Sequence, residues 1–490
     1  MGRSLLEPRR GPLASSYPSA VALVVCALVP YLMLTGAVSP LLPLLSASLG
    51  LSKSTLTLVF GLADAAYAFG TVLAVQFAVH LPVRRMLLGY VSLFLVAAVL
   101  AAWAPTGMVF AVAFIVEGLC TSLMLIAAAP ALVTGWPVRK MPVTGFVMNL
   151  CVFGAVAVGP TIGGLQASAG QWRPLFWGVA GIAAIALLFA LLTFEDAPPQ
   201  DDSAPWDIVA VSLAGVGSAA AFYGASQLEN DGPSPSSLIP LIAGMLMLAG
   251  LIVHQFRVKH PLMPVRQLAT TFPAFGILVA VAASASAIGL TELVLTAVQQ
   301  RSTPTALALQ FLPEFGAAVL TAVLFALLFR TRFTPVLAVA GLAFVAVAAA
   351  LLTGLATGGS VLVAAGSGLI GLGVGASVSP ALFITGFSLR SEQIQRVFAF
   401  LELVRGVAAF LVAPVLLYLA SAVGATPAAG TQTAIWICLA IAVAGVVGTL
   451  AVFILGGERL QAPDLKTWND DGELAWDSTP LFARLRGKKD

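Results

Sequence analysis

Charged side chains are scarce in this chain. Lysine, arginine, aspartate and glutamate together make up 9% of its 490 residues, whereas hydrophobic residues make up 59%, and the mean hydropathy is +1.01. A soluble protein carries roughly a quarter of its residues as charged side chains, which cover its surface. So little polar material cannot form a water-facing shell, and the sequence therefore predicts an integral membrane protein.

Histidine and cysteine are also rare, with three and four residues. No histidine is spaced with a second ligand as a metal site requires, or with an acid or nucleophile as an active site requires. Cysteine within apolar runs behaves as a small hydrophobe, and all four lie there: Cys26, Cys120, Cys151 and Cys438. We expect no metal, no cofactor and no enzyme activity. The dispersed net charge of +3 predicts no nucleic-acid partner.

Long apolar runs dominate the chain. A membrane-spanning helix needs about 20 mostly apolar residues. Fourteen runs meet this length: 20–48, 55–80, 86–105, 107–135, 143–168, 175–194, 208–226, 237–256, 273–300, 305–329, 335–356, 360–385, 396–421 and 432–455. The first run is too long for the core of a cleaved signal peptide, so we interpret it as a spanning helix.

The basic residues indicate an orientation. If the amino terminus is cytoplasmic, 20 of the 24 lysines and arginines fall on the cytoplasmic side, and Arg405 lies within a helix. Only Lys53, Arg173 and Arg301 fall outside. Cytoplasmic loops carry an excess of such residues. We therefore expect both termini in the cytoplasm and the protein in the cell (inner or plasma) membrane.

The fifth run, "GFVMNLCVFGAVAVGPTIGGLQ", is rich in glycine. Small residues favour close helix packing in lipid, which is the simplest interpretation. The order of the residues is more specific: Gly145, eight residues, Gly154, then Gly159-Pro160, two residues and Gly163-Gly164. This order resembles the antiporter signature in the fifth helix of the major facilitator superfamily.

Two further segments extend the resemblance. "GQWRPLFW", from Gly170, is similar to the loop before the sixth helix of drug:proton antiporters. "HPLMPVRQLATTFPAF", from His260, resembles the segment before the ninth helix of the fourteen-helix branch. The resemblance implies an all-helical major facilitator fold: an N-terminal segment (1–19), a six-helix bundle (20–194), two inserted helices (195–272), a second bundle (273–455) and a polar tail (456–490), which we expect to be only partly ordered.

The resemblance also implies a function. It predicts a monomeric secondary transporter that exports small amphiphilic or cationic compounds in exchange for protons, by alternating access. Helices one, four, nine and twelve would line the cavity, and the Gly159-Pro160 break would let the fifth helix bend. Two alternatives stay open, a metabolite facilitator or proton symporter and a membrane scaffold without transport.

The chain departs from the family pattern at three places. The loop after the second helix keeps a basic cluster, Arg84 and Arg85, but has Gln76 and His80 where the family has glycine and aspartate. Leu34 replaces an aspartate of the first helix. In the fourth helix, Phe114 and Glu117 replace an arginine and a glutamine. These departures leave open which residues carry the proton.

Acids within the spanning runs are the candidates. A carboxylate at the bilayer centre costs about 2.5–3.5 kcal/mol, so it is rarely there without a purpose. Asp64, Glu117, Glu292 and Glu314 each lie about 14 Å below the outer face, at 1.5 Å per residue. We predict that Glu117 and Asp64 couple protons and that Glu292 and Glu314 bind substrate. Alternatively, single members of this set only hydrogen-bond neighbouring helices.

Glu402 and Arg405 lie three residues apart on one face of the thirteenth run, nearer its cytoplasmic end. This spacing brings the two side chains together on a helix. They form either a structural ion pair or a cytoplasmic gate.

Overall fold

The computed structural model describes residues 12–193, 199 and 204–484. Within them, fourteen helices are long and apolar enough to span a membrane, one for each predicted run. Seven belong to the first part of the chain: α1 (Tyr17–Leu49), α2 (Lys53–His80), α3 (Val83–Trp103), α4 (Gly107–Val133), the fifth span (η1, Val138–Lys140; α5, Met141–Asn149; η2, Leu150–Gly154; α6, Ala155–Ser168), α7 (Arg173–Thr193) and α8 (Ile208–Asp231). The others are α9 (Pro235–Arg257), α10 (Thr271–Gln299), α11 (Pro304–Leu328), α12 (Thr334–Leu352), α13 (Ser360–Phe387), α14 (Ile394–Ala422, preceded by η3, Ser391–Gln393) and α15 (Pro427–Gly456).

The outer faces of these helices are apolar. Met108 of α4, Ile208 of α8 and Val361 of α13 are among the large hydrophobic side chains that are mostly exposed. A water-soluble protein rarely exposes so much apolar surface, whereas in a bilayer these side chains contact lipid. The prediction of an all-helical membrane protein is confirmed.

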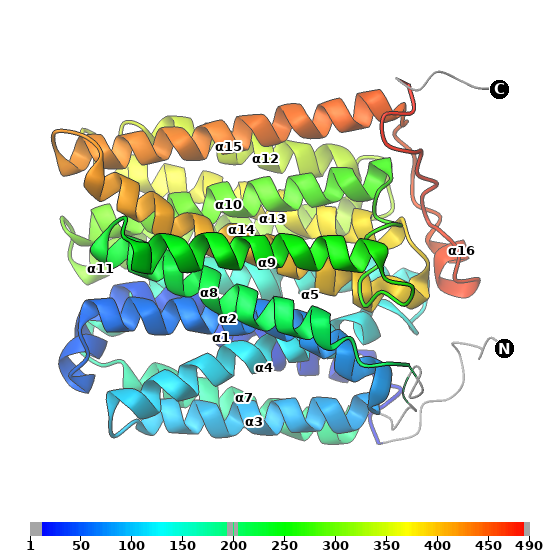
Figure 1. The fold of residues 1–490 in the computed structure, drawn as a ribbon, viewed down its shortest axis with the longest axis horizontal. Helices are drawn as coiled ribbons and strands as arrows, with labels where there is room; N and C mark the ends of the chain where they lie inside the picture. Colours follow the sequence, from blue (N-terminus) through cyan, green and yellow to red (C-terminus); the bar gives the residue numbers. More distant parts are fainter. Residues whose placement is uncertain (1–11, 194–198, 200–203, 485–490) are drawn as a thin grey trace.

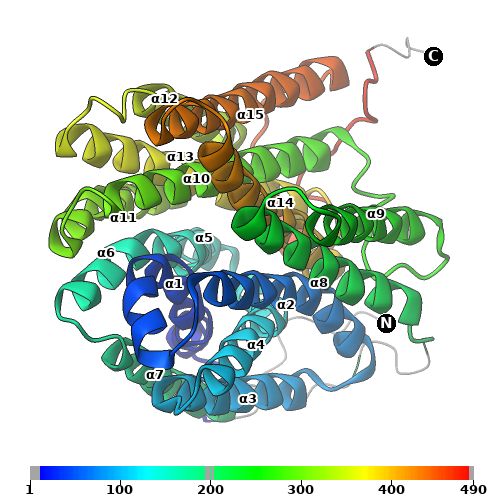
Figure 2. The ribbon, with the colours of Figure 1, turned by 60° about the vertical axis from the view of Figure 1, so that its left-hand side comes forward.

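The helices form two groups on either side of a central interface. Figure 2 shows α1–α7 on one side and α10–α15 on the other, with α8 and α9 beside them. The helix α8 packs against α2 of the first group and α14 of the second. The start of α1 and the short helix α16 (Leu465–Asp470) lie at the same end of the molecule (Figure 1), which we call the terminal end.

Glycine allows α8 and α9 to approach each other closely. A methyl group at Gly244 would lie 2.6 Å from the Gly217 carbonyl oxygen, and one at Gly224 would lie 2.6 Å from that of Ser237. Small residues at such crossings let backbones meet within lipid. The inserted helices therefore form a tight pair.

The fifth span is interrupted, but not where the sequence predicts. A π-helical turn occupies Leu150–Gly154, and α6 then continues without a break through Gly159 and Pro160. Pro160 removes one backbone hydrogen bond, yet the packing of α6 against α1 holds this part of the helix. The helix is continuous at Gly159-Pro160 in this conformation, and bending at this pair during the transport cycle stays a prediction.

The glycines of the fifth span face two different neighbours. A methyl group at Gly159 would lie 2.6 Å from the Cα of Gly36, and one at Gly163 would lie 2.9 Å from the Cα of Ala37, both in α1. Gly164 instead faces the second group, where a methyl group would lie 2.8 Å from the Pro304 carbonyl oxygen. Close packing, the simplest interpretation of this motif, is therefore what the structure shows.

The polar tail is packed more closely than its composition suggests. Trp468 and Trp476 are fully buried. The indole N–H of Trp468 donates a hydrogen bond to the Leu389 carbonyl oxygen at 2.9 Å, and the Trp476 ring stacks on Phe272 at a centroid distance of 5.7 Å. Residues 457–484 thus cover the terminal end of α10 and α13.

Candidate functional site

A cavity of about 600 Å³ lies between the two groups of helices. Its lining comes mainly from α1, α2, α8, α10 and α14, and α4, α6 and α11 contribute one or two residues each. Lys53, Gln299, Gln300 and Ser421 belong to the lining and stand at helix ends away from the terminal end. The cavity therefore opens at the opposite end, which we call the open end.

Three of the predicted acids line this cavity: Asp64, Glu292 and Glu314. Glu229 of α8 lines it as well and was not predicted. The Glu292 carboxylate is the centre of this set, because it interacts electrostatically with Asp64, Glu229 and Glu314. Ser39 of α1 lies beside it. Helices from distant parts of the sequence thus bring four acids to one cavity.

Glu117 does not line the cavity. Its side chain is fully buried, and neither carboxylate oxygen has a hydrogen-bond partner among the described residues. The Tyr31 phenol, which does line the cavity, lies within electrostatic range of both Glu117 and Asp64. Glu117 therefore lies behind the wall, with Tyr31 near both carboxylates.

The set of lining helices that the resemblance predicts is partly wrong. No described residue of α13, the twelfth span, belongs to the lining, and α4 contributes Phe114 in place of Glu117. α2, α8, α11 and α14 contribute instead. The reason is that the cavity occupies only the open end, whereas Asn149 of α5 contacts α13 at mid-span, where its amide donates to the Gly375 carbonyl oxygen at 2.9 Å.

Aromatic rings form much of the remaining wall. Phe114 lies 5.6 Å from Tyr31 and 5.3 Å from Phe60 between ring centroids. Phe222 of α8 and Phe410 of α14 also line the cavity. Aromatic faces attract cations through their quadrupole, so rings and carboxylates together favour an amphiphilic, positively charged ligand.

The two groups are joined at the terminal end. The Gln395 amide donates to the Ile126 carbonyl oxygen at 3.1 Å, and the Arg330 guanidinium donates to the Val138 carbonyl oxygen at 2.8 Å. Each bond runs between the first and the second group. Because these bonds bridge the groups where the cavity does not reach, this end is closed.

Glu402 and Arg405 form a buried ion pair, in which the Arg405 Nε–H donates to Glu402 Oε1 at 3.3 Å and a second guanidinium N–H donates to Oε2. Arg405 also lies over the Phe153 ring, 5.4 Å from its centroid. The pair therefore has the contacts of a structural element, and its role as a gate stays a prediction.

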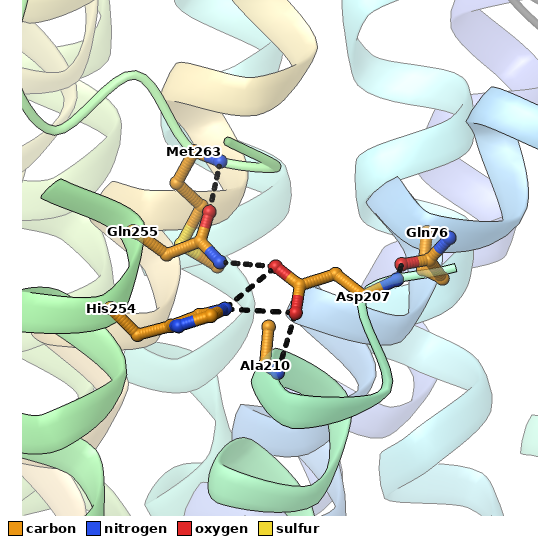
Figure 3. A network of polar contacts seen from close by, with 6 residues as sticks. All are labelled: Gln76, Asp207, Ala210, His254, Gln255 and Met263. Carbon is orange, nitrogen blue, oxygen red and sulfur yellow. Dashed lines mark hydrogen bonds and ion pairs between the residues drawn. The ribbon is translucent and has the colours of Figure 1, made fainter. Parts of the chain in front are cut away.

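Gln76 and His80, which depart from the family pattern and lie in the last turns of α2, hold the inserted helices. Gln76 accepts a hydrogen bond from the Asp207 backbone N–H at 3.0 Å. The Asp207 carboxylate contacts His254 Nε2 at 2.9 Å and accepts from the Gln255 amide at 2.9 Å. Gln255 in turn accepts from the Met263 backbone N–H at 3.1 Å. Figure 3 shows this network connecting α2 with α8, α9 and the segment before α10.

His80 provides a second attachment. Its Nε2 lies 2.8 Å from the Ala204 carbonyl oxygen, and its ring stacks on Trp206 at a centroid distance of 4.4 Å. Of the basic cluster, Arg84 donates to the Leu191 carbonyl oxygen at the end of α7, at 3.4 Å. Gln76 and His80 thus anchor α8 to α2.

Two groups of spanning helices thus surround a polar cavity that is open at one end. The sequence model of the Major Facilitator Superfamily matches residues 24–413, and the chain belongs to this family. It is therefore a transporter and not an enzyme. This confirms the family resemblance found in the sequence.

Relatives in bacteria are similar over part of their length. The chain is 27% identical over 36% of its length to the lincomycin resistance protein LmrB of Bacillus subtilis, covering 37% of that protein. It is 27% identical over 37% of its length to the multidrug resistance protein B homolog of Mycobacterium tuberculosis, covering 34% of that protein. The uncharacterized MFS-type transporter YcnB of Bacillus subtilis is 28% identical over 37% of this chain and 39% of its own length. The chain thus matches under two-fifths of each of these relatives.

Solved structures share the fold. A peptide transporter POT superposes with a TM-score of 0.61 at 15% identity, covering 90% of this chain and 96% of that chain. The human organic anion transporter MFSD10 (TETRAN) superposes with a TM-score of 0.57 at 14% identity, covering 89% and 99%. At such low identity the similarity shows the fold alone.

Proposed function

We propose that this protein exports small amphiphilic or cationic compounds in exchange for protons, by alternating access. The observation that carries the proposal is the cavity, in which four carboxylates and five aromatic rings face one space. Carboxylates supply charge for a cation, and rings supply apolar area and cation–π attraction. The names of LmrB and of the multidrug resistance protein B homolog favour the same class of substrate.

The protein in this conformation is open at one end and closed at the other. With both termini in the cytoplasm, as the basic residues predict, the open end faces outward. This is the state from which an exporter releases its substrate and takes up protons. The hydrogen bonds of Gln395 and Arg330 would break when the terminal end opens.

We propose that Asp64 and Glu117 carry the proton. Asp64 lines the cavity and is accessible to water there, whereas Glu117 is enclosed. The groups facing them are Tyr31 of α1 for both acids, Glu292 of α10 for Asp64, and Cys120 of α4 itself for Glu117. Protonation of the wall acids removes the negative charge that holds a cation, and deprotonation restores it.

A flux assay with the full chain in proteoliposomes tests this function. Radiolabelled tetraphenylphosphonium is the probe, because it is cationic, aromatic and compact enough for the cavity. We expect an imposed pH gradient to accelerate its movement in the direction opposite to the protons. Movement along with the protons would instead indicate a symporter, and transport unaffected by the gradient would indicate a facilitator. Either result would overturn proton exchange.

A further inference from the structure

We propose that Glu229 of the inserted helix α8 determines the charge specificity of the cavity. It binds the positively charged group of a substrate together with Glu292, and Lys53 of α2 competes for the same carboxylate. This inference rests on the proposed function and extends it, because the inserted helices become part of the binding site.

The helix α8 turns one face to the cavity. Phe222, Ser226 and Glu229 follow each other at intervals of four and three residues, a spacing that places them on one side of a helix, and all three line the cavity. Gly61 of α2 packs against Ser226 and leaves no room for a side chain of its own. The Asn230 amide donates to the Ser54 carbonyl oxygen at 3.3 Å. These contacts fix the position of Glu229 relative to α2.

Two further side chains indicate that the cavity takes a polar ligand. Tyr31 and Glu314 both line it, although they are only 1% and 6% exposed. The Tyr31 hydroxyl and the Glu314 Oε2 have no hydrogen-bond partner among the described residues. A buried polar atom without a partner costs free energy, so a ligand that satisfies these atoms would be bound favourably.

Lys53 is the internal competitor. It stands in the first turn of α2, lines the same cavity and interacts electrostatically with Glu229. Glu229 also interacts with Glu292. Its carboxylate thus interacts with both an ammonium group and a second acid. A substrate cation that contacts both Glu229 and Glu292 offsets the repulsion between these two carboxylates, and it takes the place of the Lys53 ammonium group beside Glu229.

The two acids are attached to different groups of helices. α8 is attached to α2 near both of its ends, by Asn230 at the open end and by Asp207 at the terminal end. Glu292 belongs to α10 in the second group. A cation between Glu229 and Glu292 therefore contacts both moving groups and draws them together at the open end.

Equilibrium binding to the purified full chain in lipid nanodiscs tests this proposal. The probes are tetraphenylphosphonium and neutral triphenylphosphine oxide, which share their aromatic groups and differ in charge. We expect Glu229→Gln to weaken binding of the cation about ten-fold, as the loss of one close charge pair predicts. Binding of the neutral probe should not change. Asp231→Asn is the matched control, because Asp231 is exposed at the end of the same helix and we expect wild-type affinities.

Lys53→Gln should change the affinity for the cation in the opposite direction. Without the competing ammonium group, affinity for the cation should rise about three-fold, in keeping with an exposed charge pair. In the double variant Lys53→Gln/Glu229→Gln this gain should vanish, because Lys53 acts through Glu229. A merely structural role of Glu229 predicts neither the opposite signs nor the loss of the gain.

The outcomes separate the two proposals. If the wild-type protein binds and transports neither probe, the proposed function is wrong. If the wild-type protein binds the cation but Glu229→Gln has the same affinity for it as Asp231→Asn, the role of Glu229 is overturned and the function stands. If Glu229→Gln does not fold, Lys53→Gln alone decides, and unchanged affinity in that variant overturns the proposal.

Discussion

The Tyr67 hydroxyl of α2 donates a hydrogen bond to the Glu402 carboxylate of α14, at 3.2 Å. The bond connects the two groups of helices directly, and its acceptor is already paired with Arg405. Tyr67, Glu402 and Arg405 are all buried. Breaking a polar contact in such surroundings costs free energy, because each group is then left in the interior without a hydrogen-bond or charge partner.

The first prediction concerns this contact. Glu402→Gln keeps the size of the side chain but leaves the Arg405 charge buried and uncompensated, so we expect a loss of about 3–5 kcal/mol in stability. Thermal unfolding of the detergent-solubilised protein measures it. Glu473→Gln is the control, because the Arg390–Glu473 pair is more than half exposed and should contribute less than about 1 kcal/mol. Equal stability of the two variants would contradict the buried pair as a structural element.

The second prediction concerns Gly159. Leucine at this position cannot fit against Gly36, because even a methyl group would lie 2.6 Å from its Cα. We expect Gly159→Leu to insert and accumulate but to lose tetraphenylphosphonium transport, and Pro160→Ala to be milder. Gly178→Ala serves as a control, because nothing lies within 4 Å of the added methyl group. Full transport by Gly159→Leu would show that α6 does not need its contact with α1.

The third prediction concerns Glu117. Glutamine keeps the shape of this buried side chain but cannot ionise, so Glu117→Gln should still bind and exchange tetraphenylphosphonium while losing acceleration by a pH gradient. Flux in proteoliposomes, with and without the gradient, measures this. If stimulation is undiminished, the proton travels elsewhere, and Asp64→Asn becomes the decisive variant.

The fourth prediction concerns orientation. Cysteines introduced at Ser236 and Gly358 should react with an impermeant thiol reagent from outside intact cells, whereas one at Lys259 should not. A cysteine at Ser203, which lies outside the described residues, should not react either. Of the native cysteines, Cys120, Cys151 and Cys438 are buried, so a variant without Cys26 gives a low background. Labelling at position 259 would contradict the predicted orientation and place this loop outside.

The fifth prediction concerns the tail. Trp468→Ala removes a fully buried ring and its hydrogen bond to Leu389, which should cost about 3–5 kcal/mol of docking energy. We expect residues 457–484 to become accessible to protease in the folded protein. Trp103→Ala, at an exposed tryptophan of α3, should leave the cleavage pattern unchanged. Resistance of the Trp468 variant would mean that other contacts hold the tail.

The fourteen helices could be predicted because lipid imposes a minimum length on every span. Glu229 could not be predicted, because the apolar run ends at residue 226, whereas α8 continues to Asp231. From the sequence alone, polar residues at the end of a helix cannot be distinguished from a loop. Only the packing of the neighbouring helices shows that these residues face a cavity. Which acids meet there depends on helix rotation and tilt, which packing decides and the apolar runs do not encode.

Other features are tertiary in origin as well. The π-helical turn at Leu150–Gly154 precedes the Gly159-Pro160 pair, and no residue type in the sequence marks its position. The network around Asp207 joins residues far apart in the chain, such as Gln76 and His254. The sequence showed only that Gln76 and His80 depart from a pattern, not what they contact.

The placement of Trp468 and Trp476 also affects how the protein is made. Chains are synthesised from the amino terminus and fold progressively, so the segment that covers α10 and α13 is translated only after all fourteen spans. Until then, the rings of Phe272 and Phe387, which contact these tryptophans, stay uncovered at the membrane surface. A nascent chain in which residues 457–484 have not yet been translated therefore leaves these apolar rings of α10 and α13 without their cover, so the order of synthesis makes the terminal end the last part of these helices to be packed.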